Sequence, residues 1–149
     1  MTSELPAGLD VDFELTRFVR RVRARSLRSL GEIHPRLDYG SFTFLLLICD
    51  APDGIRGSEI AEELGVHKST ASRAIASMEK LGLITRIPDP DDGRAHLLVA
   101  RPETEARVAE YRRNSHERLL ALLDDWTPEE VAVFARSLTR LNDRAETEF

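Results

Sequence analysis

The segment from Gly57 to Ile84, GSEIAEELGVHKSTASRAIASMEKLGLI, restricts the possible folds of this chain more than any other segment does. It contains two short helical patterns that meet at Gly65, a residue suited to the left-handed backbone that ends a helix. Ser58 is expected to cap the first helix. Two helices joined by so short a turn must cross steeply, and Ala61 supplies the small side chain needed where they touch. The segment therefore predicts a helix-turn-helix.

The second helix of this pair has one apolar and one polar face. The predicted buried stripe consists of Ala71, Ala74, Ile75, Met78 and Leu81. Gly82 stands where a helix-ending glycine is expected. The opposite face carries Lys68, Ser69, Thr70, Ser72, Arg73 and Ala76. Short side chains allow close approach to a DNA major groove, and an arginine can bind guanine through two hydrogen bonds. Taken alone, such a face is equally typical of a solvated helical hairpin that binds nothing.

Two short β-prone runs follow the helix pair, LITRIP at Leu83–Pro88 and AHLLVA at Ala95–Ala100. The stretch DPDDG between them is dense in turn residues, so the two runs predict a β-hairpin. A hairpin directly after a recognition helix is a wing. Its tip would present Asp92, Gly93 and Arg94, and an exposed arginine there can enter the narrow minor groove. The alternative is that the aspartate and the arginine merely pair in solvent.

The amino-terminal part of the chain predicts two helices. From Asp12 to about Leu30, apolar residues recur mainly at intervals of three and four, opposite an arginine-rich face. The second helix is expected over Tyr39–Cys49. It is apolar nearly all round, which indicates a central position in the fold.

The carboxyl-terminal part predicts two more helices. From Val108 to Trp126, apolar residues follow the period of a long helix that lies against another helix. A further helix should begin at Thr127, with Pro128 in its first turn and Glu130 completing a capping box. The apolar stripes of the terminal helices exceed what one small core needs. They are therefore predicted to interlock across a two-fold axis into an obligate dimer.

The net charge of -5 does not exclude a nucleic-acid partner, because the acidic excess is local. Residues 102–149 contain seven Lys/Arg and eleven Asp/Glu, whereas residues 56–101 contain seven of each. A DNA-binding surface needs only a local basic patch to meet phosphates.

Several other classes of protein are disfavoured. The longest apolar run, Phe42–Cys49, is far shorter than the roughly 20 residues of a membrane-spanning helix, and the amino terminus lacks a signal-peptide pattern, so a cytoplasmic protein without a membrane partner is expected. The four histidines show no HxxxH spacing, and there is no CxxC pair, phosphate loop or nucleophile motif. We therefore expect no enzyme, no cofactor and no metal. Zinc or redox sensing, the latter through the single Cys49, is kept as an alternative, although the apolar run favours a buried small side chain there.

These features together resemble the MarR family of bacterial transcription regulators, over nearly the whole chain. The most specific parts are the passage EKLGLITR and the aspartate-rich wing DPDDGRAHLLVA. The resemblance implies a mainly α fold with a small β-hairpin wing, in a single unit over residues 1–149. Residues 38–101 would form the winged helix-turn-helix, and residues 10–35 and 103–149 a helical dimerisation region. It also implies a homodimeric repressor of a palindromic operator, released by a small phenolic or aromatic ligand. The main rival is a winged-helix module that binds another protein.

The predicted DNA-binding set combines the polar helix face, the wing and positions that match the family motif. It consists of Ser58, His67, Lys68, Ser69, Thr70, Ser72, Arg73, Arg86, Asp92, Gly93 and Arg94. Two members depart from the family pattern. Gly93 replaces the first of two adjacent wing arginines. His67 stands where a Ser, Thr, Asn or Asp is common, so it should either cap the recognition helix less well or add a phosphate contact. Cys49 lies in the second helix, not in the first, where redox-sensing members have theirs.

A ligand can release DNA only by binding a dimer shape in which the recognition helices are wrongly spaced. Its pocket is therefore expected where the dimer helices meet the DNA-binding region, near the stretch HPRLDYGSFTF. The candidate residues are His34, Arg36, Tyr39, Phe42 and Tyr111. They suit a flat anionic or phenolic compound, with a basic group at one end and a tyrosine hydroxyl to orient it. The alternative is that these aromatic residues belong to an ordinary core.

Overall fold

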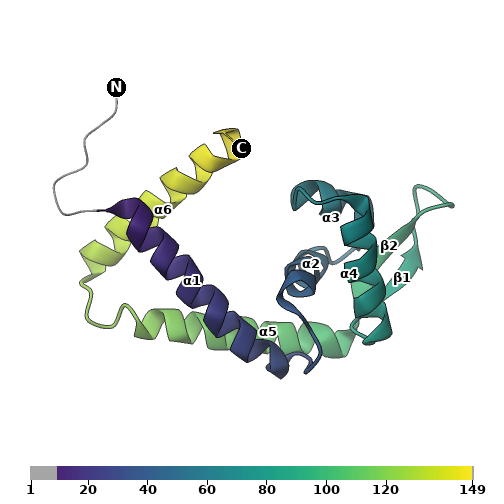
Figure 1. Cartoon of the computed structure of the whole chain (residues 1–149), viewed down its shortest axis with the longest axis horizontal. Coiled ribbons are helices and arrows are strands. Elements are labelled where there is room, and N and C mark those ends of the chain that lie inside the picture. Colours follow the sequence, from purple (N-terminus) through teal and green to yellow (C-terminus); the bar gives the residue numbers. More distant parts are fainter. Residues whose placement is uncertain (1–9, 149) are drawn as a thin grey trace. The chain divides into compact units, whose positions relative to one another are not determined.

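The computed structural model describes residues 10–148, which are mainly helical with one two-stranded antiparallel sheet (Figure 1). In chain order the elements are α1 (Val11–Ser29), the short 3-10 helix η1 (Leu30–Glu32), α2 (Tyr39–Asp50), α3 (Gly57–Glu63), α4 (Lys68–Lys80), β1 (Ile84–Pro88), β2 (His96–Ala100), α5 (Pro102–Ala121) and α6 (Pro128–Glu148). The predicted fold class is confirmed. The chain divides into two compact units, and the boundary lies inside α5, between Tyr111 and Arg112.

Helix α2 forms the centre of the first unit, as its apolar sequence predicted. Its buried side chains include Phe42, Phe44, Leu45 and Ile48. Both α4 and β2 pack against it (Figure 1). Ile60 of α3, Met78 of α4 and Val108 of α5 are almost completely buried in the same core. This packing fixes the direction of α4, and with it the direction of the polar face of that helix.

The turn of the helix-turn-helix forms where the sequence predicted it. Gly65 ends α3 with a φ of +60°, and Gly82 follows α4 with a φ of +72°. The prediction that Ser58 caps α3 is wrong. The N-cap is Arg56, whose backbone N–H donates to Glu59 Oε2 at 2.7 Å, so Ser58 lies inside the first turn.

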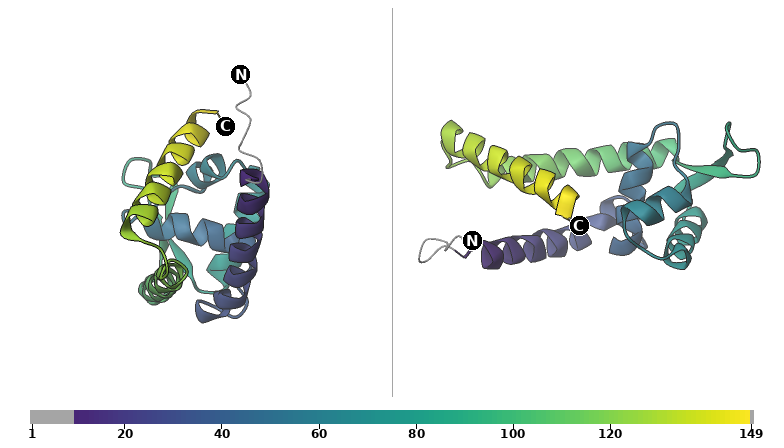
Figure 2. Two further views of the ribbon diagram at one scale, coloured as in Figure 1. Left: turned by 90° about the vertical axis from the view of Figure 1, so that its left-hand side faces the viewer. Right: turned by 90° about the horizontal axis from the view of Figure 1, so that it is seen from above.

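The hairpin is extended by a short third segment. Strands β1 and β2 pair from Ile84 opposite Ala100 to Pro88 opposite His96 (Figure 2). In addition, Ile55 forms an antiparallel bridge with Leu98, through backbone hydrogen bonds of 3.1 and 2.9 Å. The loop between α2 and α3 is thereby attached to the sheet, which the sequence analysis did not predict.

The second unit contains the end of α5 and the whole of α6. Helix α6 begins with the predicted capping box: the backbone N–H of Thr127 donates to Glu130 Oε2 at 2.8 Å, and that of Glu130 donates to Thr127 Oγ1 at 3.2 Å. Trp126 and Phe134 pack edge to face, with ring centroids 5.4 Å apart. Among residues 10–148, no helix is long and apolar enough to cross a bilayer.

Candidate nucleic-acid interface

The polar face of α4 is exposed over its whole length. Ala71, Ile75 and Met78 are buried. The side chains on the other face are all exposed, namely Lys68, Ser69, Thr70, Ser72, Arg73 and Ala76. No acidic residue lies in the first turn of the helix. The face therefore offers two cations and three hydroxyl groups to a polyanion, from a helix.

His67 is the N-cap of α4, and its side chain makes no capping hydrogen bond, as the sequence predicted. The first N–H groups of the helix thus lack a side-chain acceptor from this residue. The positive end of the helix dipole lies at the same place, beside Lys68. Backbone donors at a helix start are suited to a phosphate group.

The wing loop is ordered by aspartates. Asp92 Oδ1 accepts a hydrogen bond from the backbone N–H of Arg94 at 3.0 Å, and the N–H of Ala95 donates to the carbonyl oxygen of Asp92 at 2.9 Å. Asp92 thus contacts the backbone of Arg94, and no carboxylate of the described residues forms an ion pair with its guanidinium. The loop projects from the sheet (Figure 1), which leaves Arg94 exposed as the wing hypothesis requires.

Asp89, at the start of this loop, is buried with 5% of its surface exposed. Its Oδ2 accepts a hydrogen bond from Arg56 Nε at 2.6 Å, and its Oδ1 accepts one from the backbone N–H of Asp91 at 2.9 Å. The N–H of Asp91 and the Arg56 guanidinium together hold the pKa of the Asp89 carboxyl below its ordinary value, against the effect of burial. This ion pair was not predicted from the sequence, because its partners are 33 residues apart.

Arg86 was predicted to contact DNA, and in the structure its guanidinium binds a carboxylate of the same chain. Its Nε donates to Glu79 Oε1 at 2.7 Å and its Nη2 to Glu79 Oε2 at 3.0 Å. The fork of two hydrogen bonds joins β1 to the end of α4. The hydrogen bonds from Arg86 are the main cause that lowers the pKa of Glu79.

Three of the five effector candidates lie together. The rings of Phe42 and Tyr111 meet edge to face with centroids 5.1 Å apart, and those of Tyr39 and Phe42 are 6.4 Å apart. Helix α1 completes the cluster, because Arg23 Cζ lies 5.1 Å from the centroid of the Tyr39 ring and the Tyr111 hydroxyl donates to Ser26 Oγ at 3.2 Å. Phe42 and Tyr111 are buried and Tyr39 is half-buried.

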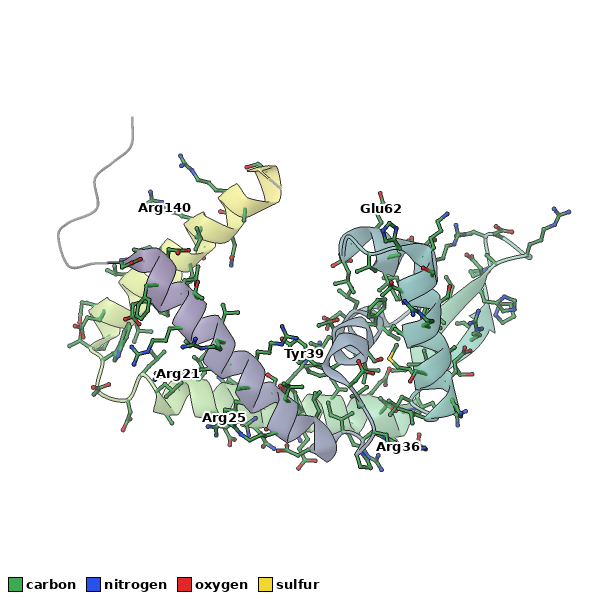
Figure 3. All side chains as sticks on the ribbon, in the orientation of Figure 1. Arg21, Arg25, Arg36, Tyr39, Glu62 and Arg140 are labelled. Carbon is green, nitrogen blue, oxygen red and sulfur yellow. The ribbon has the colours of Figure 1, made fainter. Side chains whose placement is uncertain are left out.

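The two basic candidates lie in the turn before α2. The Nδ1 atom of His34 accepts a hydrogen bond from the backbone N–H of Arg36 at 3.1 Å. The His34 ring therefore stabilises the turn. Arg36 is exposed and lies at this turn, whereas Tyr39 lies beside α1 (Figure 3).

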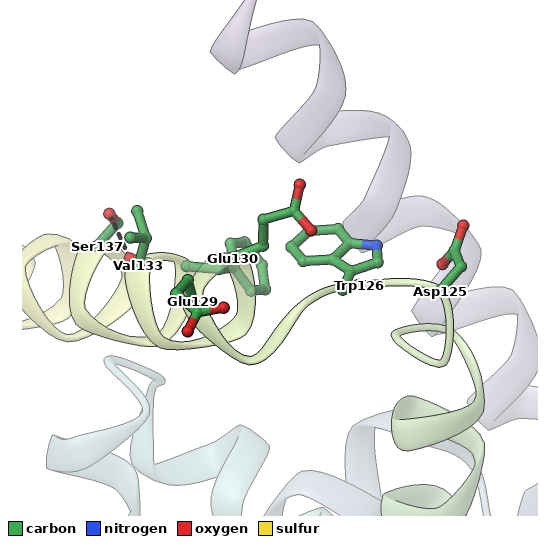
Figure 4. Close-up of a pocket in the computed structure, with 7 residues that line it drawn as sticks. Asp125, Trp126, Glu129, Glu130, Val133 and Ser137 are labelled. Atoms are coloured by element: carbon green, nitrogen blue, oxygen red, sulfur yellow. Dashed lines mark hydrogen bonds between the residues drawn. The ribbon is translucent and has the colours of Figure 1, made fainter.

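The second unit contains an open hollow of about 610 Å³ that the sequence analysis did not predict (Figure 4). It is lined by Asp125, Trp126, Glu129, Glu130, Val133, Phe134 and Ser137. Its lining is mainly apolar, from Trp126, Val133 and Phe134, and it includes three carboxylates. Among residues 10–148, no group of three His, Cys, Asp or Glu side chains is placed to hold a metal ion.

Comparisons with known proteins agree with this geometry. Residues 37–95 match the family model described as MarR family. The HTH-type transcriptional regulator YxaD of Bacillus subtilis (strain 168) is 31% identical over 142 residues, which cover 95% of this chain and 96% of that protein.

Solved structures have the same fold. A MarR protein from Peptoclostridium difficile DA00132 is 26% identical and superposes with a TM-score of 0.75, over 99% of this chain and 96% of that one. Streptococcus pneumoniae FabT in complex with DNA is 19% identical, with a TM-score of 0.73 over 90% of this chain and 96% of that one, which shows similarity of fold alone. Because the match extends along nearly the whole chain, we conclude that this protein belongs to the MarR family of transcriptional regulators, which are not enzymes.

Proposed function

We propose that the protein is a sequence-specific repressor that binds double-stranded DNA as a homodimer in the cytoplasm. The observation that supports this best is the exposed face of α4, where no acidic residue occurs from His67 to Ser77. In this proposal α4 enters the major groove, and Arg94 of the wing contacts the adjacent minor groove. The FabT structure, which has a similar fold, contains DNA and supports the same use of the fold.

The proposed dimer is supported by apolar side chains that the single chain leaves uncovered. On α1 and α6 these side chains are between 37 and 59% exposed, and they include Phe13, Phe18, Val19, Phe134, Leu138 and Leu141. Exposed apolar helix faces of this kind are typical of an interface with another protein. A two-fold dimer would present two α4 helices to a palindromic operator, about one helical turn of DNA apart. This assigns residues 38–101 to DNA binding and residues 10–35 and 103–149 to dimerisation.

The proposed effector is a phenol or an aromatic acid that binds at the aromatic cluster of Tyr39, Phe42 and Tyr111. Tyr39 supports this, because it is half-buried and its ring lies against the Arg23 cation. A thermal-shift screen of phenols and aromatic acids, on the wild type and on Phe42→Ala, tests the site. Compounds that stabilise the wild type alone should also release the operator. Stabilisation that is unaffected by changes at His34, Arg36, Tyr39, Phe42 and Tyr111 would place the ligand elsewhere.

The experiment that tests DNA binding is a titration of the protein with labelled DNA from the region that flanks its own gene. The affinity should exceed that for random DNA, and its logarithm should fall linearly with the logarithm of salt concentration as phosphate counterions are released. A winged-helix module that binds proteins would show no such selective, salt-sensitive binding.

A further inference from the structure

The segment between α2 and α3 connects three elements of the winged helix-turn-helix. Ile55 exchanges both backbone hydrogen bonds with Leu98 of β2. Arg56 is the N-cap of α3. A Cβ atom at Gly57 would lie only 2.9 Å from Ile75 Cδ1, so the backbone here is in close contact with α4. The backbone of Arg56 is therefore fixed by the sheet on one side and by the helix pair on the other.

From this position the Arg56 side chain reaches the wing. Its Nε donates to Asp89 Oδ2 at 2.6 Å, and its Nη2 forms an ion pair with the same oxygen. Asp89 directly follows β1, at the start of the wing loop. The Asp89 side chain is 3% exposed, whereas that of Arg56 is 39% exposed. The carboxylate is thus enclosed, and the guanidinium that neutralises it lies at the surface.

A continuous set of hydrogen bonds leads from Asp89 to the wing tip. The backbone N–H of Asp89 donates to the carbonyl oxygen of Ala95 at 3.2 Å. The backbone N–H of Ala95 donates to the carbonyl oxygen of Asp92 at 2.9 Å. Asp92 Oδ1 in turn accepts the N–H of Arg94 at 3.0 Å. The placement of the Arg94 backbone therefore depends on a loop whose base is held by Arg56.

We propose that Arg56 is a positioning residue for the wing, which acts through Asp89 to hold Arg94 where it meets the minor groove. This role rests on the DNA-binding function proposed above. It differs from the role of a phosphate contact, because the Arg56 cation is already neutralised by a carboxylate of the same chain.

The direction in which Asp89→Asn changes the DNA affinity distinguishes a positioning role of Arg56 from a purely electrostatic effect. Replacing Asp89 by Asn removes a negative charge near a polyanion, so electrostatics alone predicts tighter DNA binding. If Arg56 were a phosphate contact, the same change would free it and again tighten binding. If Arg56 positions the wing through Asp89, the same change should instead weaken binding. Asp91→Asn is the matched control, since it removes the same charge from the same loop at a position that is exposed and does not bind Arg56.

The test is a double-mutant cycle on the full chain with its operator at constant salt, measured by fluorescence anisotropy. Arg94→Ala should weaken binding at least about tenfold, because the wing of each subunit loses a charge-assisted hydrogen bond. Arg56→Gln and Asp89→Asn should each approach this loss, and neither should weaken binding further in the Arg94→Ala background. Asp91→Asn should bind as tightly as the wild type or more tightly. Hydroxyl-radical footprints of Arg56→Gln should lose protection only in the minor groove that flanks the site of α4.

The outcomes separate this role from the function on which it rests. If the wild type shows no selective binding, the proposed function fails and the positioning role fails with it. If the wild type binds selectively and the effects of Arg56→Gln and Arg94→Ala add, DNA binding stands and the positioning role alone is overturned. The same holds if Asp89→Asn binds as tightly as Asp91→Asn. Should Arg56→Gln fail to fold, the cycle of Asp89→Asn with Arg94→Ala decides by the same criteria.

Discussion

At the scale of single residues, the exposed side chains of α4 differ in what they can recognise. Arg73 has a planar fork that matches the two acceptors on guanine, whereas Lys68 is a point charge at the start of the helix. Because both are exposed, a change at either should affect binding more than folding.

Arg73→Ala should cost about 1–3 kcal/mol of binding free energy and relax the preference at one base position in each half-site. Lys68→Ala should weaken binding to all sequences alike and reduce the slope of the salt dependence by about one for each subunit. Titrations of each variant against operator and random DNA check both expectations. Equal losses on the two DNAs for Arg73→Ala would argue against a base contact.

Two carboxylates give folding stability a defined pH dependence. The hydrogen bonds from Arg86 lower the pKa of Glu79 below its ordinary value of 4.5. The hydrogen bond from the Asp91 N–H, and to a smaller extent the Arg56 guanidinium, lower the pKa of the Asp89 carboxyl below its ordinary value of 3.8. The unfolded chain therefore binds more protons in acid, so this stability is present above about pH 4.5 and is lost as pH falls through the folded pKa values.

The expected result is that the urea midpoint of wild type falls more steeply from about pH 6 to about pH 3 than that of Glu79→Gln. At neutral pH this variant should lose only about 0.5 kcal/mol of folding stability, because the side chains of Arg86 and Glu79 remain 49% and 31% exposed to solvent. The two pH profiles, recorded by circular dichroism, provide the check. Parallel profiles would mean that the pair has no net effect on stability.

At the scale of elements, the short segment of Gly54 and Ile55 determines how α2 and α3 are joined to the sheet. Gly54 has a φ of +91°, and a Cβ atom there would lie 2.8 Å from Leu97 Cβ. Both the backbone conformation and the lack of space therefore require glycine at this position.

Gly54→Ala should lower the free energy of unfolding by about 1–3 kcal/mol, the range expected for backbone strain and overpacking. Gly31→Ala is the matched control, since a Cβ at Gly31 has no neighbour within 4 Å and its φ is not positive. Its unfolding free energy should stay close to the wild-type value. Chemical denaturation of the two variants measures the difference, and a similar effect of both would contradict the explanation.

At the scale of the whole molecule, α1 and α6 each carry an apolar face that the single chain leaves exposed. Phe134, Leu138 and Leu141 are spaced three and four residues apart, so they lie on one side of α6. In an obligate dimer this stripe is covered, and neither subunit is stable alone.

Leu138→Glu should prevent dimerisation and abolish operator binding, because it places a charge in the proposed interface. Thr139→Glu changes the next residue, which is exposed and lies away from the stripe, and it should remain dimeric. Sedimentation of both variants at micromolar concentration provides the measurement. A folded, monomeric wild type under these conditions would overturn the dimer.

The sequence by itself determined the elements whose causes are local. Helices form from hydrogen bonds between residues four apart, so the period of the apolar side chains predicted α1, α2, α4 and α6 to within a few residues. Capping boxes and helix-ending glycines act over three or four residues, and Thr127, Gly65 and Gly82 were therefore predicted correctly. The exposed face of α4 followed from the same period.

Only the tertiary structure decided which distant groups meet. Arg56 binds Asp89 across 33 residues, and Tyr111 donates to Ser26 across 85. These pairs depend on how the helices and the sheet pack, which no local spacing encodes. The bridge of Ile55 to Leu98 likewise exists because packing brings two separate segments together.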